Sequence, residues 1–262
     1  MADADERLQA GDLDGARAAL IETVKRAPSD QGARMFLFQL QCLLGEWDKA
    51  QAQLRALAQL SPEAQMLAVT YNMAIDAERV REAAFAGQTQ PALLVGSSPW
   101  AGDLAAALGA QAQGRFDEAE ERRARAFEAA PDTPGELDGA RFDWIADADA
   151  RFGPALEAIV SGQWGLLPFD AISSIKTEGV VDLRDLVWLP VQLAFKSGQS
   201  VAAFLPTRYP GAHLEDDPAL KLARSTLWRD EPWGQAGAGQ HLLALSDDSE
   251  VGLAGLRNLT FS

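Results

Sequence analysis

The chain has 262 residues, a formal net charge of −15 and a sequence pI of about 4.5. A surface with this charge repels the backbone of nucleic acids and anionic membranes, so neither is expected as a partner. The single cysteine, Cys42, excludes a disulfide within the chain. Residues 1–7 are acidic and unlike a signal peptide, and no apolar run approaches the ~20 residues that cross a bilayer. These features predict a protein of the cytoplasm, where thiols stay reduced.

A short motif occurs three times in the first half of the chain, beginning at Gly11, Gly45 and Gly114. Each glycine is followed by an Asp at the third position, an Ala at the fifth and a Pro at the seventeenth. The first two copies are 34 residues apart, which is the period of a tetratricopeptide repeat (TPR). The third copy lies 69 residues further on, so we expect a degenerate repeat between them.

Each residue of the motif has a physical role in a helical hairpin. The glycine ends one helix because it enters the left-handed conformation at little cost. The Asp is expected to cap the next helix, the Ala allows close packing, and the Pro ends that helix. One hairpin cannot cover its own apolar face, so the motif predicts a stacked array of hairpins over residues 1–135.

The helices expected within this array differ in polarity. The helix predicted over residues 30–44 is apolar nearly all round, which indicates burial on several sides or one apolar face that is offered to a partner. Further helices are predicted at 46–60, from Pro62 to Ala86, and from Trp100 to Leu108, with a loop over 87–99.

Strand signals replace the helical period after residue 135, and residues 136–152 form the predicted junction. Two hairpins are expected, one joining 156–160 to 164–169 and one joining 191–195 to 200–205. Asp217 and Pro218 indicate the start of a short helix. Other strands are expected at 171–177, 226–228 and 240–245, and the Gly-rich segment 231–239 is expected to be mobile. The prediction is an α+β protein in which the TPR-like array precedes a small SH3-like β-barrel domain over residues 153–262.

The chain contains no Walker A sequence, no Gly-x-Gly-x-x-Gly and no Gly-x-Ser-x-Gly, so no cofactor is expected. His213 and His241 share no ligand spacing with each other or with Cys42, so no metal is expected either. The strongest enzyme-like feature is the trio Asp143, Asp147 and Asp149 around Trp144.

These carboxylates admit two interpretations. They hold a divalent cation or act as an acid–base pair, or they cap a turn and pair with Arg141 or Arg151. Asp182, Arg184 and Asp185 admit the same two interpretations. Trp47 occupies the aromatic position of the repeat and is expected in the core. Three later tryptophans belong either to the core of the barrel or to an apolar groove between the domains: Trp144, Trp164 and Trp188.

Five stretches of distinctive sequence are spread over the chain: 34–40 with 44–47, 142–149 with 151–154, 167–169, 182–190 and 206–211. The second and fourth contain the runs Phe-Asp-Trp-Ile-Ala-Asp and Leu-Arg-Asp-Leu-Val-Trp. On these stretches the chain resembles the ImpE family, also called SciE-type or TagJ, of accessory proteins in bacterial type VI secretion. The tail after Gly234 adds nothing to the resemblance.

The resemblance implies an adaptor of the cytoplasm that is not an enzyme. Such proteins bind the N-terminal helix of the small contractile-sheath subunit (TssB-type) and are thought to connect the sheath with the ClpV-type AAA+ unfoldase. A helical array offers a groove in which an amphipathic helix can lay its apolar face. The expected recognition surface is helix 33–44 with the junction, and the residues predicted to bind the partner are Arg34, Phe38, Tyr71, Trp144, Asp147, Asp149 and Trp188.

Two other functions remain open from the sequence. The first is a metal-assisted hydrolase whose acidic site, formed by Asp143, Asp147 and Asp149, lies at the junction. The second is a general TPR scaffold whose partner is unrelated to secretion.

Overall fold

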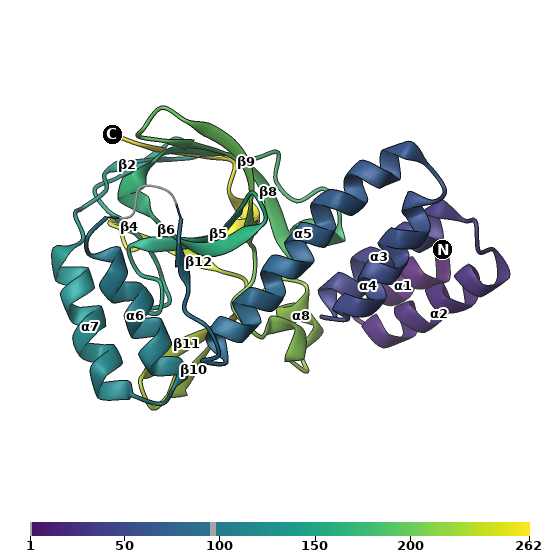
Figure 1. Ribbon diagram of the computed structural model, residues 1–262, viewed down its shortest axis with the longest axis horizontal. Coiled ribbons are helices and arrows are strands. Elements are labelled where there is room, and N and C mark those ends of the chain that lie inside the picture. Colours follow the sequence, from purple (N-terminus) through teal and green to yellow (C-terminus); the bar gives the residue numbers. More distant parts are fainter. Residues whose placement is uncertain (1, 95–97) are drawn as a thin grey trace.

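The computed structural model describes residues 2–94 and 98–262, so part of the predicted loop 87–99 lies outside the described residues. Seven helices in the first half of the chain build an elongated arm and a second helical layer (Figure 1). Their bounds are α1 (Ala2–Gln9), α2 (Leu13–Arg26), α3 (Gln31–Leu43), α4 (Trp47–Ala58), α5 (Pro62–Phe85), α6 (Ala101–Ala112) and α7 (Phe116–Ala129). Helices α1–α4 stack at one end of the molecule, α6 and α7 lie at the other, and α5 runs between them (Figure 1).

The repeat glycines adopt the predicted left-handed conformation, with φ of 80° at Gly11, 69° at Gly45 and 74° at Gly114. The predicted capping role of the repeat Asp is wrong, because this residue lies inside the first helical turn in all three copies. In the first copy the cap is Asp12, whose carboxylate accepts a hydrogen bond from the amide of Gly15 at 2.8 Å. A carboxylate in the first turn still interacts favourably with the helix dipole.

The degenerate repeat expected after the second copy is absent from the described residues. Instead, α5 is a single helix of 24 residues that is capped by Ser61 and begins at Pro62. It packs against α4, with bonds that reach as far along α5 as Glu82, and its second half also lies against the sheet. The segment after it contributes β1 (Ala92–Leu93), which pairs in parallel with a strand of the sheet. The helical array is therefore interrupted, since one long helix takes the place of a hairpin.

The β region contains most of the remaining chain. Its strands are β2 (Gly135–Leu137), β3 (Ala140–Phe142), β4 (Ile145–Asp147), β5 (Ala155–Val160), β6 (Gln163–Pro168), β7 (Ile172–Lys176), β8 (Trp188–Phe195), β9 (Ser200–Pro206), β10 (Thr226–Glu231), β11 (Gly234–Gly239), β12 (Leu242–Leu245), β13 (Glu250–Gly252) and β14 (Asn258–Phe261). Both predicted hairpins are confirmed, as β5–β6 and β8–β9. The predicted short helix is α8 (Pro218–Lys221), which Asp217 caps at 2.8 Å.

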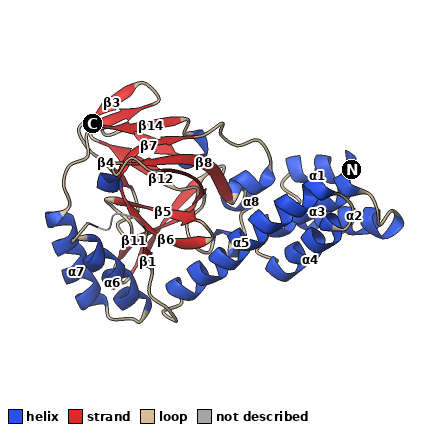
Figure 2. Cartoon of the chain, turned by 45° about the horizontal axis from the view of Figure 1, so that its top comes forward, coloured by secondary structure: helices blue, strands red, loops and turns tan. Residues whose placement is uncertain are grey.

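The main sheet has nine strands in the order β1-β6-β5-β9-β8-β7-β14-β2-β3, and separate small sheets are formed by β13-β12-β4 and β10-β11 (Figure 2). Because the ladder runs from β1 to β3 without returning, the described strands do not close into the predicted SH3-like barrel. The C-terminal strand β14 inserts between β7 and β2, which extends the sheet into the predicted junction. Strand signals predict where strands lie but not whether the last strand pairs with the first.

The Gly-rich segment 231–239, expected to be mobile, forms the turn and the second strand, β11, of a regular hairpin with β10. Glycine is required at one of its positions, since a Cβ at Gly237 would lie 2.3 Å from a ring carbon of Tyr209. The hairpin therefore packs closely on the body of the protein.

Helices and sheet share their cores. Trp164 and Trp188 are fully buried in the same apolar cluster as α2–α5, and Trp47 packs against Trp188 with ring centroids 5.8 Å apart. The core position predicted for Trp47 is thus confirmed. Helix α7 ends at Ala129 and β2 begins at Gly135, while the domain boundary at residue 135 remains a prediction.

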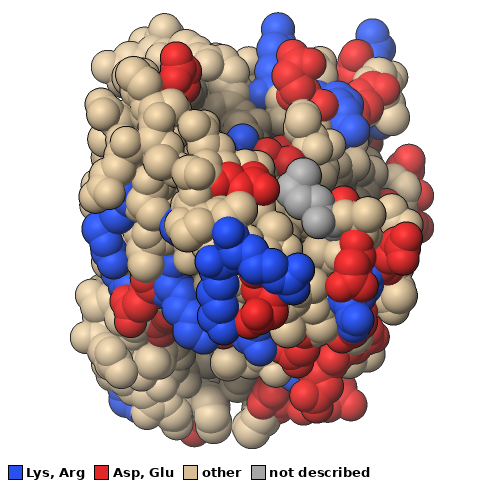
Figure 3. Space-filling view, turned by 90° about the vertical axis from the view of Figure 1, so that its right-hand side faces the viewer, with Lys and Arg blue, Asp and Glu red and all other residues tan. Residues whose placement is uncertain are grey.

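The outer end of the helical arm carries interleaved acidic and basic side chains (Figure 3). Pairs such as Arg17 with Glu46, at 2.6 Å, belong to this end. Among the described residues, none of the helices is both long and apolar enough to span a membrane.

Candidate functional site

A buried network of charged side chains joins α5 to the sheet. The guanidinium of Arg81 donates to both carboxylate oxygens of Glu157, at 2.7 and 2.6 Å, and to Glu78 at 2.7 Å. It also donates to the carbonyl of Arg208 at 2.9 Å. The indole N–H of Trp188 donates to Glu78 at 3.0 Å, and that of Trp164 donates to Glu157 at 2.9 Å. Every carboxylate here has several donors, as buried charges require.

His241 continues the network toward β4. Its Nδ1 lies 2.6 Å from Asp147, and its Nε2 lies 3.1 Å from Glu157. Burial favours the neutral ring, but the two carboxylates outweigh it and raise the pKa of His241. Burial alone would raise the pKa of Glu157, yet Arg81 and His241 lower it to about 2. Both ring nitrogens of His241 therefore face carboxylates, an arrangement that favours the protonated ring.

The charges of this network balance when His241 is protonated. The four carboxylates are those of Glu78, Asp147, Asp149 and Glu157, and the four cations are Arg81, Arg151, Arg208 and His241. The guanidinium of Arg208 binds the carbonyls of Leu43 at 3.0 Å and Lys221 at 2.7 Å. The network thus ties the helical arm to the β region through many buried hydrogen bonds, which favours a single arrangement of the two.

The carboxylates of Asp143, Asp147 and Asp149 do not converge on one point. Asp149 binds the guanidinium of Arg151 at 2.5 Å and the amide of Gly237 at 2.7 Å. Asp147 accepts from Tyr209 at 2.9 Å as well as from His241, and Asp143 is exposed and separate. Within the described ranges, no group of three or more His, Cys, Asp or Glu residues is placed to hold a metal ion. The geometry therefore supports the structural interpretation of these carboxylates and not the hydrolytic site.

The second acidic cluster is structural as well. Asp182 and Asp185 form a capping box on the short helix Leu183–Leu186, with Asp182 accepting from the amide of Arg184 at 3.1 Å. Asp182 also pairs with the guanidinium of Arg184 at 2.8 Å.

The residues predicted to bind a partner do not form one surface. Phe38, Tyr71 and Trp188 are buried and pack together, with Phe38 edge-on to Tyr71 at 5.7 Å and Tyr71 at 6.2 Å from Trp188. They stabilise the core, so the expectation that helix 33–44 presents aromatic anchors is wrong. The apolar circumference of this helix is explained by burial between α2, α4 and the short helix Leu183–Leu186.

The other predicted residues lie apart from this cluster. Arg34 donates to the carbonyl of Pro28 at 2.6 Å and to the side chain of Gln53 at 2.9 Å. Asp147 and Asp149 are buried in the ionic network. Only Trp144, with 40% of its surface exposed, offers an aromatic face to solvent.

Helix α5 carries an apolar stripe that the sequence interpretation missed. We define the α5 stripe as Met66, Val69, Met73 and Val80, which are all exposed. The spacings of three, four and seven residues place them on one face of the helix. Met73 also borders an apolar hollow of about 230 Å³ between α5 and the strands β8 and β9, which includes Pro190 and Phe204. These residues lie in the helix predicted from Pro62 to Ala86, but the sequence interpretation gave them no part in binding.

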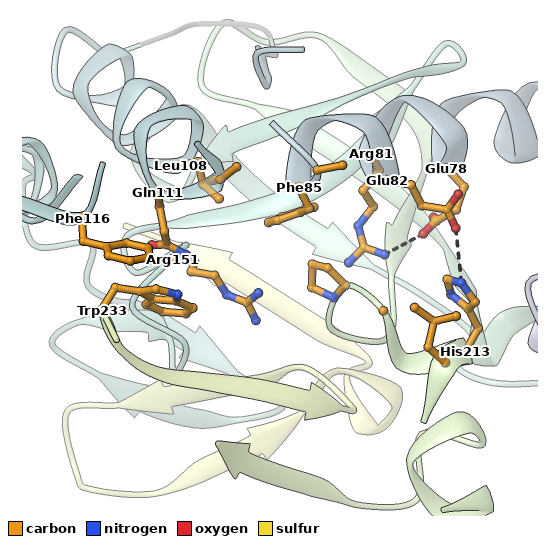
Figure 4. A pocket seen from close by; sticks show the side chains of 15 residues that line it. Glu78, Arg81, Glu82, Phe85, Leu108, Gln111, Phe116, Arg151, His213 and Trp233 are labelled. Carbon is orange, nitrogen blue, oxygen red and sulfur yellow. Dashed lines mark hydrogen bonds and ion pairs between the residues drawn. The ribbon is translucent and has the colours of Figure 1, made fainter. Parts of the chain in front are cut away.

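A second hollow, the α5–α6 pocket, has a volume of about 660 Å³ (Figure 4). Its walls come from α5, α6, α7, the loop 210–214 and the tip of the β10–β11 hairpin. Glu82 and His213 lie at one end, and Arg151 and Trp233 lie at the other (Figure 4). Burial, together with the charge of Arg208, lowers the pKa of His213 to about 4, so its ring is neutral at pH 7. No motif in the sequence indicates this pocket, because these elements and the turn that carries Arg151 lie far apart in the chain.

The fold and these surfaces define a helical-repeat protein with an attached β-sheet region and exposed apolar surface suited to protein contacts. The sequence profile described as "ImpE protein" matches residues 139–260, and that described as "Tetratricopeptide repeat" matches 7–70. A Pseudomonas aeruginosa protein named "Type VI secretion system accessory component TagJ" is 42% identical over 260 residues, which cover 98% of this chain and 90% of that protein. The chain therefore belongs to the ImpE family, of which TagJ is a member.

The crystal structure of a Vibrio parahaemolyticus protein shares the whole architecture. It superposes with a TM-score of 0.87 at 22% identity and covers 99% of this chain and 97% of its own. This likeness supports the fold, including the interrupted helical array.

Proposed function

We propose that the chain is a type VI secretion accessory protein that acts as an adaptor and not as an enzyme. In this role it binds the N-terminal helix of the small sheath subunit and helps connect the sheath with the ClpV-type unfoldase, both in the cytoplasm. The name of the P. aeruginosa relative supports the secretion role, and the TPR-like helices support a protein partner.

The observation that carries the proposal is the α5 stripe. Met66 is 77% exposed and Val69 is 63% exposed, although both are large apolar side chains. Isolated exposed apolar residues are ordinary, but several on one face of one helix indicate a contact surface. Because the stripe follows a helix, it matches the apolar face of an amphipathic partner helix that packs alongside it.

The hollow next to Met73 provides a place for an anchoring side chain. It is bounded by Met73 and Thr70 on one side and by Pro190, Ala203 and Phe204 on the other. Its volume, about 230 Å³, suits one large aliphatic or aromatic side chain of the partner. Met73 at its rim can adapt its shape to a ligand because its side chain is unbranched and flexible.

Charge gives a further requirement for the partner. The exposed carboxylate of Asp76 lies on α5 between Met73 and Val80, and the chain as a whole carries a net charge of −15. A bound helix is therefore expected to carry basic residues beside its apolar face, which would speed association at low salt.

The test uses a synthetic peptide of the sheath subunit's N-terminal helix, taken from the same gene cluster, and calorimetric titration. Val69→Asp places a charge in the stripe and is expected to weaken binding at least ~10-fold. The matched control is Val181→Asp, because Val181 is also highly exposed, at 81%, but lies on the loop after β7. Equal affinity of wild type and Val69→Asp, with unchanged thermal stability, would remove the stripe from the proposal.

The connection to the unfoldase needs a separate measurement. The purified chain, the sheath subunit and the N-terminal domain of the unfoldase are mixed in pairs and together, and complexes are separated by size. Adaptor function requires a ternary complex that is absent when the chain is left out. Formation of the same sheath–unfoldase complex without the chain would contradict the connecting role while leaving helix binding intact.

A further inference from the structure

The α5–α6 pocket has two chemically different ends joined by apolar walls (Figure 4). Phe85, Leu108 and Phe116 line its middle. The guanidinium of Arg151 projects into the pocket between Trp233 and Phe85 (Figure 4). A pocket of this size, with apolar walls and a few oriented polar groups, is typical of ligand-binding sites.

Arg151 is held rigidly although it faces the pocket. Its Nε and Nη2 donate to Asp149 at distances between 2.5 and 3.0 Å, and Nη2 also reaches the carbonyl of Gly237 at 3.2 Å. Among the described residues, none accepts a hydrogen bond from its Nη1. The side chain is only 9% exposed, so a donor in a fixed orientation is left available to a ligand.

A second arginine adds positive charge behind the same wall. Arg123 of α7 is 9% exposed and donates to Gln111, which lines the pocket, while its Nε is buried without a partner in the described chain. Both Arg123 and Arg151 lie within 6 Å of the centroid of the Trp233 ring, at 5.8 and 5.5 Å. No described carboxylate forms an ion pair with Arg123, although the charges of Asp149 and Glu120 both act on it. Asp149 pairs with Arg151 instead.

The opposite end of the pocket accepts hydrogen bonds. Glu82 receives the indole N–H of Trp47 at 2.9 Å through Oε1, and its Oε2 has no partner among the described residues. The distribution of charge therefore has a direction, with an anion favoured beside Trp233 and a hydrogen-bond donor favoured beside Glu82. A peptide has both kinds of group along one chain.

We propose that the α5–α6 pocket binds a peptide carboxylate, with the anionic group on Nη1 of Arg151 and a neighbouring apolar side chain against Phe85, Leu108 and Phe116. A peptide N–H faces Glu82. Arg123 supplies the excess positive charge that makes the Trp233 end attractive to an anion. This site is separate from the α5 stripe and does not depend on the proposed sheath contact.

The experiment uses three short probes that differ in their carboxylate. Acetyl-Ala-Phe has a free C-terminal carboxylate, acetyl-Ala-Phe-amide has none, and acetyl-Phe-Glu-amide carries one on a side chain. Titrations follow the indole N–H resonance of Trp233 in the full chain. At least one acid is expected to bind ten-fold or more tightly than acetyl-Ala-Phe-amide, and which acid binds shows the source of the carboxylate. Equal binding of acids and amide, or no binding up to about 5 mM, would overturn the proposal.

Matched variants test the role of the arginines. Arg123→Gln is expected to reduce the preference for acid over amide at least five-fold. Arg122→Gln is expected to leave it unchanged, because Arg122 pairs with Asp103 of α6 and Glu118 of α7 and does not line the pocket. Trp233→Ala, at the tip of a surface hairpin, lacks the reporter resonance, so its binding is followed by calorimetric titration. It is expected to bind both the acid and the amide more weakly than wild type does, and it serves if Arg123→Gln does not fold. Unchanged preference in Arg123→Gln, or unchanged binding in Trp233→Ala, would contradict the assignment.

Discussion

Arg81 of α5 and Glu157 of β5 form a buried ion pair joined by two hydrogen bonds of 2.7 and 2.6 Å. The two residues are 76 positions apart in the chain, and each belongs to a different part of the fold. Because Glu157 also accepts from His241 and Trp164, removing its charge affects three partners at once. The behaviour of this pair decides how firmly the helical arm is attached to the sheet.

Glu157→Gln should therefore destabilise the protein strongly. The substitution leaves Arg81 with Glu78 as its remaining carboxylate and His241 with Asp147 as its remaining carboxylate. Breaking one partner of a buried pair costs about 3–5 kcal/mol. Chemical denaturation followed by far-ultraviolet circular dichroism measures the free energy of unfolding. Glu118→Gln is the control, since Glu118 pairs with Arg115 and Arg122 at the surface and is expected to matter much less. Equal losses in both variants would contradict the assigned importance of the buried pair.

The stability of the chain should depend on pH through His241. Its pKa is raised above the ordinary value of 6.5, so its contribution is fully present below that pH and is lost as pH rises through the folded value. Asp147 and Glu157 face the ring on two sides, and Tyr209 packs on it. Denaturation curves from pH 6 to 9 should show wild type losing stability relative to His241→Gln. Parallel curves would show that the ring is not charged in the folded state.

At acid pH the direction reverses because carboxylates lose their charge. The pKa of Glu157 is lowered to about 2, so its stabilising contribution is present above its unfolded value near 4.5 and is lost as pH falls toward 2. His213, whose pKa is lowered to about 4, adds to the loss between pH 6.5 and 4, because the unfolded chain binds the proton first. In His213→Asn, the free energy of unfolding should therefore depend less steeply on pH between pH 6.5 and 4 only. A change confined to pH values below 4 would contradict this assignment.

Two repeat glycines allow backbone strain to be separated from steric overlap. Gly45 and Gly114 both have positive φ, and an added Cβ at Gly45 would lie 2.4 Å from Cδ2 of His213, whereas one at Gly114 meets nothing within 4 Å. Gly114→Ala should cost about 1–2 kcal/mol from the left-handed conformation alone. Gly45→Ala should cost more, because His213 and the loop that carries it must move. Thermal denaturation of both variants gives the comparison, and equal losses would exclude a role for the His213 contact.

Cys42 should be unreactive in the folded protein. It is fully buried, and burial raises the pKa of its thiol well above the ordinary value, so almost no thiolate forms at neutral pH. Ellman's reagent should label the thiol only as fast as the chain unfolds, and labelling should become rapid in denaturant. Fast labelling under native conditions would show that α3 opens locally.

The residues chosen as binding anchors show where reasoning from sequence failed. Phe38, Tyr71 and Trp188 lie in segments of high apolar content, and such segments serve equally well as core or as contact surface. Met66 and Val69 carry the same kind of signal but are exposed, because α5 extends beyond the sheet that covers its second half. The sequence pattern shows that a residue is apolar, but only the neighbours that pack against it decide whether it is buried or exposed.

Local features were determined by the sequence itself. The left-handed turns at Gly11, Gly45 and Gly114 and the hairpins β5–β6 and β8–β9 depend on residues close together in the chain, where turn chemistry and periodicity act. The tertiary structure alone decided that β14 joins β7 to β2, that α5 replaces a repeat, and that Arg81 meets Glu157 and His241. These contacts join segments tens of residues apart or more, and their energy exists only once the packed faces have excluded water and brought the charges together.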